Sequence, residues 1–331
     1  MDAAESTVAP ATDALPGDVQ VEPVSCPMGC PAGATEVARG TDRQHGFGGT
    51  FPVLRCDTCG LMRTDPRPTM PTIGAYYPQN YGPYQGAPAD ETAPGLLERL
   101  LMALRWDGTK HLVPPVVPGR VLEVGCASGQ FLRKLRRRGW TVRGIEPSAE
   151  AAERATRAGF AVHNGPLETA PPPVDPLDLV VASHAFEHLH DPLGSFRRLR
   201  DWSKPGAFLS CAVPDASSIL FGRFRGAWYD LDVPRHLFHY TPATLTALLA
   251  KAGWRVERVR PERTLNGWVG SIGYWLRDRG RGTSALGDRF LAFPDSASPL
   301  KRLTVPLSFV ASALAQTGRM VVWARADTVP I

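Results

Sequence analysis

The feature that most constrains this chain of 331 residues is an alternation of strand-like and helix-like segments that begins near residue 119. Short runs rich in branched apolar residues alternate with stretches of helical spacing, a pattern typical of βαβ units, in which helices connect parallel strands. The expected strands are 120–124, 141–145, 160–163, 177–182, 207–213, 254–260 and 320–326. They predict an α/β fold with a doubly wound seven-stranded sheet.

The segments between these strands carry helix start and stop signals. A helix is expected from Gly129, and another from Ser148, a good capping residue, to Ala158. A further helix is expected to begin at Thr241, which a proline follows, and to end before Gly253.

A glycine-rich turn follows the first strand, in the segment Glu123-Val-Gly-Cys-Ala-Ser-Gly129. Its small residues let a ligand approach the backbone at the carboxyl edge of the sheet. Glu146 ends the second strand, where an acidic side chain can accept hydrogen bonds from a ribose. A NAD-binding fold uses the same arrangement, but Gln130 stands where the dinucleotide pattern has its third glycine.

Four segments resemble motifs of the class I S-adenosylmethionine (SAM)-dependent methyltransferases, a Rossmann-like family, and the resemblance implies that the last strand of the sheet is antiparallel. They are 123–129, Gly144-Ile-Glu-Pro-Ser148, Asp178 to Pro192 and Lys204 to Pro214. The resemblance implies that the glycine turn faces the amino-acid part of SAM, that Glu146 lies at the ribose and that 165–168 lie near the adenine. The cofactor-binding residues that it implies are Glu123, Gly125, Ala127, Ser128, Gly129, Glu146, Pro147, Gly165, Leu167, Ser183, His184 and His188.

Four of the six cysteines form two early pairs, Cys26 with Cys30 and Cys56 with Cys59. Such spacings let the thiolates converge on one ion, and the segment between the pairs can form a hairpin that closes a tetrahedral site. Disulfides or free thiols are the alternatives, but nothing in the chain indicates an oxidising compartment. Four thiolates leave no coordination position open, so we expect structural Zn²⁺ that supplies most of the folding free energy of this small segment.

The segment after Gly60 contains Pro66-Arg67-Pro68, Tyr76-Tyr77 and Tyr81. It resembles the N-terminal zinc-binding module that precedes a bacterial class I methyltransferase domain, although the first cysteine pair has three intervening residues where two are commoner. This layout resembles enzymes of bacterial saccharide and natural-product pathways. The resemblance implies a small-molecule acceptor, a sugar or glycosylated metabolite, with O-methylation as the first expectation and C-methylation as the second.

The segment Trp228 to Tyr240 follows the fifth strand and is dense in ionisable groups. His236 is the candidate general base, because the pKa of histidine lies near neutrality, and Tyr229 or Arg235 is expected to position the acceptor. The alternative for His236 and His239 is a helix cap or a hydrogen bond within the loop.

The motif His184-Ala-Phe-Glu187-His188 resembles the Glu-x-x-Glu-His metal sites of some methyltransferases, with His184 in place of the first glutamate. With His236, these residues could assemble a site for a second divalent metal. The commoner role of this loop in the family is to border the cofactor. Glu187 is a pocket residue under both interpretations and is the third catalytic candidate.

An insertion rich in aromatic residues lies between Pro261 and Thr317. We expect a helical cap on the core, and the second interpretation is a lid that touches a membrane surface to reach a lipid-linked acceptor. The stretch 303–314 is interrupted by Pro306 and is too short to span a membrane, which takes about 20 residues.

The net charge of +5 admits a second function, a nucleic-acid-binding or RNA-modifying methyltransferase, and a third interpretation is a cofactor-binding scaffold without catalysis. A zinc module that grips a polymer needs a basic face, whereas 26–60 hold only Arg39, Arg43 and Arg55, so we expect no nucleic-acid partner. The chain has no long apolar run and does not begin with a signal-peptide pattern, so we expect a cytoplasmic location.

The chain is therefore expected to divide into five parts. They are a disordered tail (1–24), a zinc-binding module with a tyrosine-rich linker (25–94), a SAM-binding core (95–260), a helical insertion (261–318) and a final strand with a tail (319–331).

Overall fold

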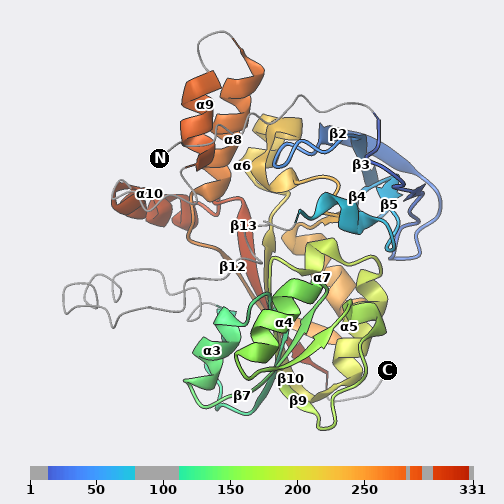
Figure 1. Cartoon of the computed structure of the whole chain (residues 1–331), viewed down its shortest axis with the longest axis vertical. Coiled ribbons are helices and arrows are strands. Elements are labelled where there is room, and N and C mark those ends of the chain that lie inside the picture. The colour runs from blue at the N-terminus through green and yellow to red at the C-terminus, as the bar shows by residue number, and fades with distance from the viewer. Residues whose placement is uncertain (1–13, 79–111, 281–283, 293–300, 328–331) are drawn as a thin grey trace.

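The computed structural model describes residues 14–78, 112–280, 284–292 and 301–327. Figure 1 shows an α/β body in the lower half, a β-rich N-terminal module at the upper right and a helical insertion at the upper left.

Seven strands form the central sheet, in the order β12-β13-β10-β9-β6-β7-β8. They are β6 (Arg120–Val124), β7 (Thr141–Glu146), β8 (Ala161–Asn164), β9 (Leu177–Ser183), β10 (Ser203–Pro214), β12 (Trp254–Pro261) and β13 (Arg319–Ala326). Neighbours from β10 to β8 are parallel, and β13 is antiparallel to both β10 and β12. The predicted seven-stranded α/β fold with an antiparallel last strand is confirmed.

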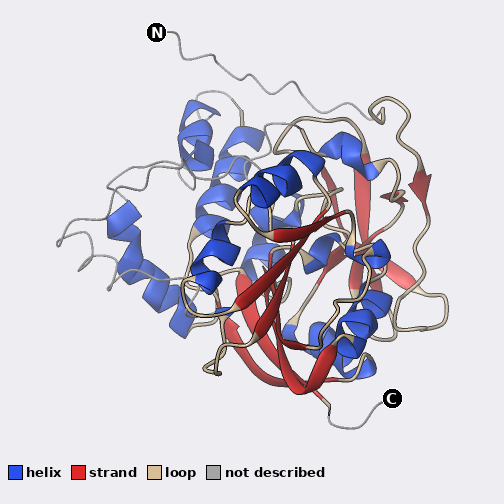
Figure 2. Ribbon diagram, turned by 60° about the horizontal axis from the view of Figure 1, so that its bottom comes forward, coloured by secondary structure: helices blue, strands red, loops and turns tan. Residues whose placement is uncertain are grey.

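The helices of the body begin where the sequence places capping residues. Ser148 accepts a hydrogen bond from the backbone N–H of Ala151 at the start of its helix, and Thr241 forms a capping box with Thr244. The helices are α3 (Gln130–Arg136), α4 (Ala149–Arg157), α5 (Pro192–Asp201), α6 (Ile219–Phe224) and α7 (Pro242–Lys251). Figure 2 shows helices on both sides of the strands. Short 3₁₀ turns follow two of the strands, η3 (Leu167–Thr169) after β8 and η4 (Phe186–His188) after β9. Two more, η5 (Arg225–Ala227) and η6 (Tyr229–Leu231), follow α6.

The N-terminal module is completed by a strand from the α/β body. Its elements are β1 (Val21–Glu22), β2 (Ala34–Thr41), β3 (Thr50–Cys56), β4 (Met62–Thr64), β5 (Arg67–Pro68) and η1 (Ile73–Tyr76). β1 pairs with β5, and the other strands form a sheet of order β11-β4-β3-β2. β11 (Phe238–His239) lies downstream, in the segment that holds His236, and pairs antiparallel with β4. The module and the candidate catalytic segment are thus held by one sheet.

The module and the body also share their hydrophobic interior. Leu61 of the module is buried in the same cluster as Leu237 and Phe238, and Phe51 is buried in a second cluster with Trp228. The module therefore gains apolar burial against the body, a source of stability that the segment does not have on its own.

A buried ion cluster joins the same two parts. Arg235 is fully buried, and its Nη2 atom lies 2.7 Å from Asp42 Oδ1 and 2.5 Å from Asp232 Oδ1. Its Nη1 atom donates to the Tyr76 carbonyl at 3.0 Å. Beside this cluster, the Thr64 hydroxyl of the module donates to the carbonyl oxygen of His236, the residue that follows Arg235, at 2.7 Å.

The insertion contains α8 (Asn266–Asp278), α9 (Ser284–Ala292) and α10 (Lys301–Ala313). α8 packs on η6, where Ser271 Oγ accepts a hydrogen bond from the Tyr229 N–H and the ring of Tyr274 stacks on that of Tyr229. The expected interruption at Pro306 is wrong, since α10 continues through it. A proline removes one intrahelical hydrogen bond and crowds the preceding turn, which can bend a helix without ending it. Within the described residues, no helix combines the length and the apolar character needed to cross a membrane.

The expected N-terminal tail is partly structured, because Val21–Glu22 form β1 and Val24 is buried. Residues 1–13 of that tail, and 79–94 of the linker with Tyr81, lie outside the described residues. The division of the chain into five parts stays a prediction.

Candidate active site

The glycine-rich turn between β6 and α3 adopts a backbone that requires small residues. Gly125 and Gly129 have φ of 73° and 80°, and Ala127 has φ of 46°, the left-handed region that L side chains rarely adopt. A Cβ atom on Gly125 would lie 2.9 Å from the Cβ of Ala185, so a larger residue would collide there. The turn is held to the neighbouring strand, since the N–H groups of Gly125 and Cys126 both donate to the Ile145 carbonyl.

Glu146 fixes the turn from the end of β7. Its Oε2 atom accepts a hydrogen bond from the Ala127 N–H and its Oε1 atom one from the Ser148 N–H, both at 2.8 Å. Burial raises the pKa of this carboxyl, and the two backbone N–H groups oppose that rise. Glu146 thus orders the turn and also lines the adjoining cavity.

A cavity of about 1380 Å³ lies at the carboxyl ends of β6, β7 and β9. Its walls come from the glycine turn, from the segment around His236, from the N-terminal module and from the insertion. The sequence-predicted residues that line it are Gly125, Ala127, Glu146, Pro147, Leu167, Ser183, His184, His188, Tyr229 and His236. This volume is larger than most single-ligand pockets, so it can hold a cofactor and an acceptor side by side.

Four residues predicted to bind the cofactor do not line the cavity: Glu123, Ser128, Gly129 and Gly165. Glu123 is buried beneath the turn, where burial and then the nearby Glu146 raise its pKa well above the usual range. A direct contact of Glu123 with the ligand is therefore not what the structure shows. Gly129 begins α3, and a Cβ atom there would collide with Phe160, so it serves packing.

His236 makes a loop hydrogen bond and also faces the cavity. Its Nδ1 atom lies 2.8 Å from the Asp230 carbonyl, which can only accept, so Nδ1 donates. The Nε2 atom of the neutral ring is then an acceptor, 3.9 Å from Glu187 Oε1 and 3.8 Å from Asp232 Oδ2. The Nδ1 atom thus makes the loop hydrogen bond of the alternative interpretation, and the Nε2 atom is the one available for the role of general base.

His188 packs against His236 with the ring centroids 4.8 Å apart. Its Nδ1 atom lies 2.9 Å from the Arg235 carbonyl and 3.0 Å from the Tyr77 hydroxyl. Burial, and then repulsion from His236 when that ring is protonated, lower the pKa of His188 to about 4, so the His188 ring is neutral near neutral pH.

Glu187 is fully buried behind the histidines and does not line the cavity. Its Oε1 atom lies 3.3 Å from His184 Nδ1, whose Nε2 atom lies 3.2 Å from Glu262 Oε2. Burial lowers the pKa of His184, but the two carboxylates outweigh it and raise that pKa to about 9. Burial raises the pKa of Glu187, but His184 outweighs it and holds that pKa at about 2. Glu187 is therefore an anion that orients the histidines.

The structure separates the two residues expected to position the acceptor. Tyr229 lines the cavity with its ring stacked on Tyr274. The prediction for Arg235 is wrong, because its guanidinium is fully buried between Asp42 and Asp232 and does not reach the cavity. His239 is also buried away from the cavity, and its Nε2 atom lies 3.2 Å from the Thr64 hydroxyl.

Several cavity residues were not selected from the sequence: Gln44, Ile73, Tyr77, Asp230, Asn266 and Arg319. Arg319 begins β13 and donates to Asp230 Oδ1 from Nε at 3.0 Å and from Nη2 at 2.7 Å. Tyr77 belongs to the tyrosine-rich segment, and that composition was the one sequence feature that could have placed Tyr77 at the cavity. Nothing local marks Gln44, Asn266 or Arg319, because only the tertiary fold brings them to the cavity.

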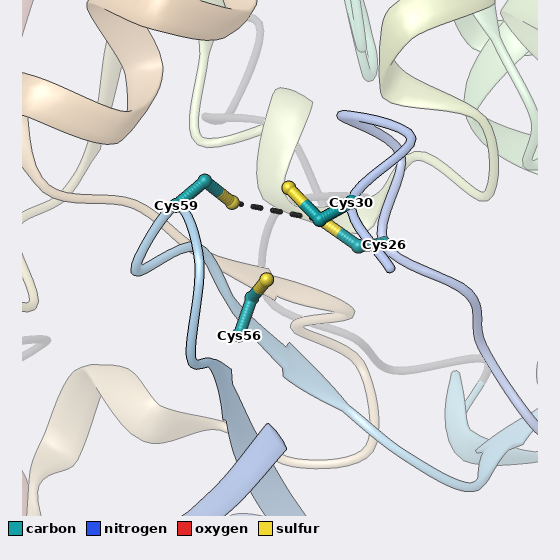
Figure 3. Close-up of side chains that lie close together, drawn as sticks. All are labelled: Cys26, Cys30, Cys56 and Cys59. Atoms are coloured by element: carbon teal, nitrogen blue, oxygen red, sulfur yellow. Dashed lines mark hydrogen bonds between the residues drawn. The ribbon is translucent and has the colours of Figure 1, made fainter. Parts of the chain in front are cut away.

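The four early cysteines converge on one point. Figure 3 shows the side chains of Cys26, Cys30, Cys56 and Cys59 pointing toward one another. Their Sγ atoms lie within 4.8 Å of one another, and those of Cys26 and Cys59 are 3.5 Å apart. A tetrahedral site with Zn–S bonds of about 2.3 Å needs sulfurs about 3.8 Å apart, which this arrangement fits. All six cysteines of the chain are free, so the disulfide alternative does not hold in this structure.

Comparisons with known proteins agree with this architecture. Residues 96–259 match a family model described as a methyltransferase domain. A tRNA U34 carboxymethyltransferase of Shewanella sp. strain W3-18-1 is 30% identical over 142 residues, which cover 38% of this chain and 43% of that protein. A malonyl-[acyl-carrier protein] O-methyltransferase of Serratia marcescens is 26% identical over 248 residues, which cover 72% of this chain and 91% of that protein.

Among solved structures, a SAM-dependent methyltransferase of Mesorhizobium loti has 20% sequence identity and a TM-score of 0.45, covering 66% of this chain and 96% of that one. The chain spans less than half the length of several curated relatives, including the Shewanella protein. The matched domain extends from before β6 into β12 and so contains the glycine turn, Glu146 and the histidines of the cavity. The chain therefore belongs to the SAM-dependent methyltransferases.

Proposed function

We propose that this protein transfers a methyl group from SAM to an oxygen atom of a small-molecule acceptor, a sugar or a glycosylated metabolite, with transfer to carbon as the second candidate. One observation carries the proposal: a single cavity is lined both by the glycine turn and by His236. An acceptor hydroxyl bound at that end would meet a proton-accepting nitrogen beside the cofactor.

The residues of the turn fit the cofactor. Gly125 and Ala127 expose backbone to the cavity, Glu146 lies at the end of β7 where the ribose would bind, and Leu167 offers an apolar contact for the adenine. SAM supplies an activated methyl group on a sulfonium, so the protein has only to align the acceptor with it.

The residues at the other end suit a polar acceptor. His236 Nε2 is placed to take the proton of a hydroxyl, while Tyr229 and Tyr77 offer ring faces for a sugar to pack on. Tyr77 also holds His188, so the N-terminal module contributes to the orientation of the histidines.

Charge at this end argues for a small neutral acceptor over a nucleic acid. Asp230 and Asp232 line the cavity there. They pair with Arg319 and Arg235, which are therefore not free to bind a phosphate backbone. The relative that acts on tRNA is matched over less than half of its length. RNA binding by the full chain at low salt would favour the nucleic-acid alternative.

We also propose that Cys26, Cys30, Cys56 and Cys59 hold a structural Zn²⁺ ion, and that the protein works in the cytoplasm, where thiols stay reduced. Burial and the neighbouring thiols raise the pKa of Cys59 to about 12, so the four thiols do not all ionise without a cation. The surface contact of the insertion with a membrane stays a prediction.

The decisive experiment is incubation of the full chain with methyl-labelled SAM and fractionated extract from its source, followed by mass analysis. We expect a glycosylated small molecule heavier by one methylene unit, with the label on oxygen. Binding of SAM without any labelled product would indicate the scaffold interpretation, and labelled RNA would overturn the choice of acceptor.

Glu146→Gln is expected to raise the dissociation constant of SAM about 10–100-fold, because an amide can accept only one of the two backbone hydrogen bonds that hold the turn. Calorimetric titration with SAM measures the effect. The control is Glu150→Gln, an exposed carboxylate at the start of α4, which should bind SAM like the wild type. Equal affinities of the two variants would contradict the role of Glu146.

Cys59→Ser is expected to lose the zinc that the wild type retains after dialysis into metal-free buffer, because three thiolates and a hydroxyl bind Zn²⁺ weakly. Metal analysis of the dialysed proteins measures this loss. The matched control is Cys211→Ala, which removes a buried thiol of the central sheet and should keep the zinc. Full retention by Cys59→Ser would rule out the four-cysteine site.

A further inference from the structure

Three side chains at the acceptor end of the cavity offer metal-binding atoms close together. Glu187, His188 and His236 each contribute one such atom, and these atoms lie within 4.8 Å of one another. They come from η4 and from the turn before β11, and the N–H of Leu237 donates to the Glu187 carbonyl at 2.8 Å. The cluster is therefore held by backbone as well as by side chains.

The two histidines are oriented as metal ligands are. Each ring donates from Nδ1 to a main-chain carbonyl, His236 to Asp230 at 2.8 Å and His188 to Arg235 at 2.9 Å. In a neutral ring that leaves Nε2 unprotonated and able to bind a cation. A hydrogen bond from the second nitrogen to a carbonyl is the usual way in which proteins fix a metal-binding histidine.

Glu187 supplies a carboxylate that is short of partners. It is fully buried, and its Oε2 atom accepts no hydrogen bond within the described residues. A buried carboxylate oxygen without a partner carries a desolvation penalty that a bound cation would remove. This orphaned oxygen is an observation independent of the histidine geometry.

The sequence hypothesis of a metal held by His184, Glu187 and His188 together with His236 needs one correction. Both ring nitrogens of His184 face carboxylates, those of Glu187 and Glu262, so this ring has no free nitrogen for an ion. The other three residues of the hypothesis, Glu187, His188 and His236, remain together as the cluster.

We propose that Glu187, His188 and His236 form a second metal site, separate from the four cysteines, that binds a divalent cation such as Mn²⁺, Fe²⁺ or Zn²⁺. Two imidazoles and one carboxylate suit these ions and leave coordination positions open. His188 and His236 line the cavity, so the open positions face the acceptor.

The metal site has a consequence that rests on the proposed function. A cation at His236 would occupy the Nε2 lone pair, so His236 would act as a ligand. The cation would lower the pKa of a bound acceptor hydroxyl, whose proton would pass to water. Without the cation, the same Nε2 atom accepts the proton. Acceptors with two adjacent oxygens, such as vicinal diols, would fill two open positions at once.

The test is a titration with Mn²⁺, followed by electron paramagnetic resonance of the free ion, on the full chain carrying one equivalent of zinc. The four thiolates take the zinc first, and Mn²⁺ prefers nitrogen and oxygen ligands, so the two sites are measured apart. We expect one Mn²⁺ per chain in the wild type and at least a 10-fold weaker affinity in Glu187→Gln and in His236→Gln. The matched control is His163→Gln, a β8 histidine outside the cavity, which should bind Mn²⁺ like the wild type.

Circular dichroism and retained zinc show whether each variant is folded. If Glu187→Gln does not fold, the test rests on His236→Gln, whose amide can still donate to the Asp230 carbonyl. Absence of Mn²⁺ binding by the wild type, or equal affinity in folded variants, would overturn the proposal. The titration contains neither SAM nor acceptor. Mn²⁺ binding without methyl transfer would thus support the metal site and contradict the proposed methyl transfer. Methyl transfer without Mn²⁺ binding would support the proposed activity and overturn the metal site.

Discussion

Arg235→Met should lower the free energy of unfolding by about 3–5 kcal/mol, the effect of breaking a buried ion cluster by removing one partner. Asp42 and Asp232 lie on either side of this guanidinium, and Asp42, like Arg235, is fully buried. Methionine keeps the length of the side chain but leaves the two carboxylates without their cation. The cluster joins the N-terminal module to the segment that carries His236, so we expect loss of methyl transfer to accompany the loss of stability.

Chemical denaturation followed by tryptophan fluorescence measures this change. The matched control is Arg39→Met, which removes an exposed arginine of the same module that pairs with Glu36. Exposed ion pairs contribute little to stability, so this variant should unfold like the wild type. Similar denaturation midpoints for the two variants would show that the Arg235 cluster does not hold the two parts together.

His236→Gln should lower kcat about 10²–10⁴-fold while leaving the dissociation constant of SAM unchanged. The glutamine amide can still donate to the Asp230 carbonyl, so the loop keeps its shape, but it offers no nitrogen lone pair to a proton or a cation. The cofactor turn is built from Gly125, Ala127 and Glu146 and does not contact this ring in the hydrogen bonds described.

Single-turnover rates with the identified acceptor, together with calorimetric titration of SAM, separate chemistry from binding. A rate within about threefold of the wild type would show that His236 only holds the conformation of its loop. A parallel loss of SAM affinity would instead assign the effect to a disturbed cavity. His163→Gln again serves as the histidine outside the cavity.

The parts of the fold that sequence predicts well are those that local patterns determine. β6 begins and ends at the expected residues, and Ser148 caps α4 as predicted, because both depend on neighbours within a few positions. The glycine turn and Glu146 were found for the same reason, since their spacing is short and their conformational demands are specific.

The errors concern contacts between residues far apart in the chain. The sequence predicted that Arg235 positions the acceptor. Its partner Asp42 lies 193 positions away, and no pattern near Arg235 indicates that pairing. Gln44 and Arg319 reach the cavity only because the module and β13 fold against the body. His236 was selected for the chemistry of its ring, while the two roles of its nitrogens depend on the position of Asp230.

The pairing of β11 with β4 imposes an order of events during synthesis. The module is synthesised first, but the hydrogen-bond partner of Thr64 is His236, which lies 172 residues downstream and just before β11. At about 5–20 residues per second, the ribosome needs roughly 10–30 s to supply it. During that interval the outer edge of β4 has no strand beside it, and an unpaired edge invites association with other chains.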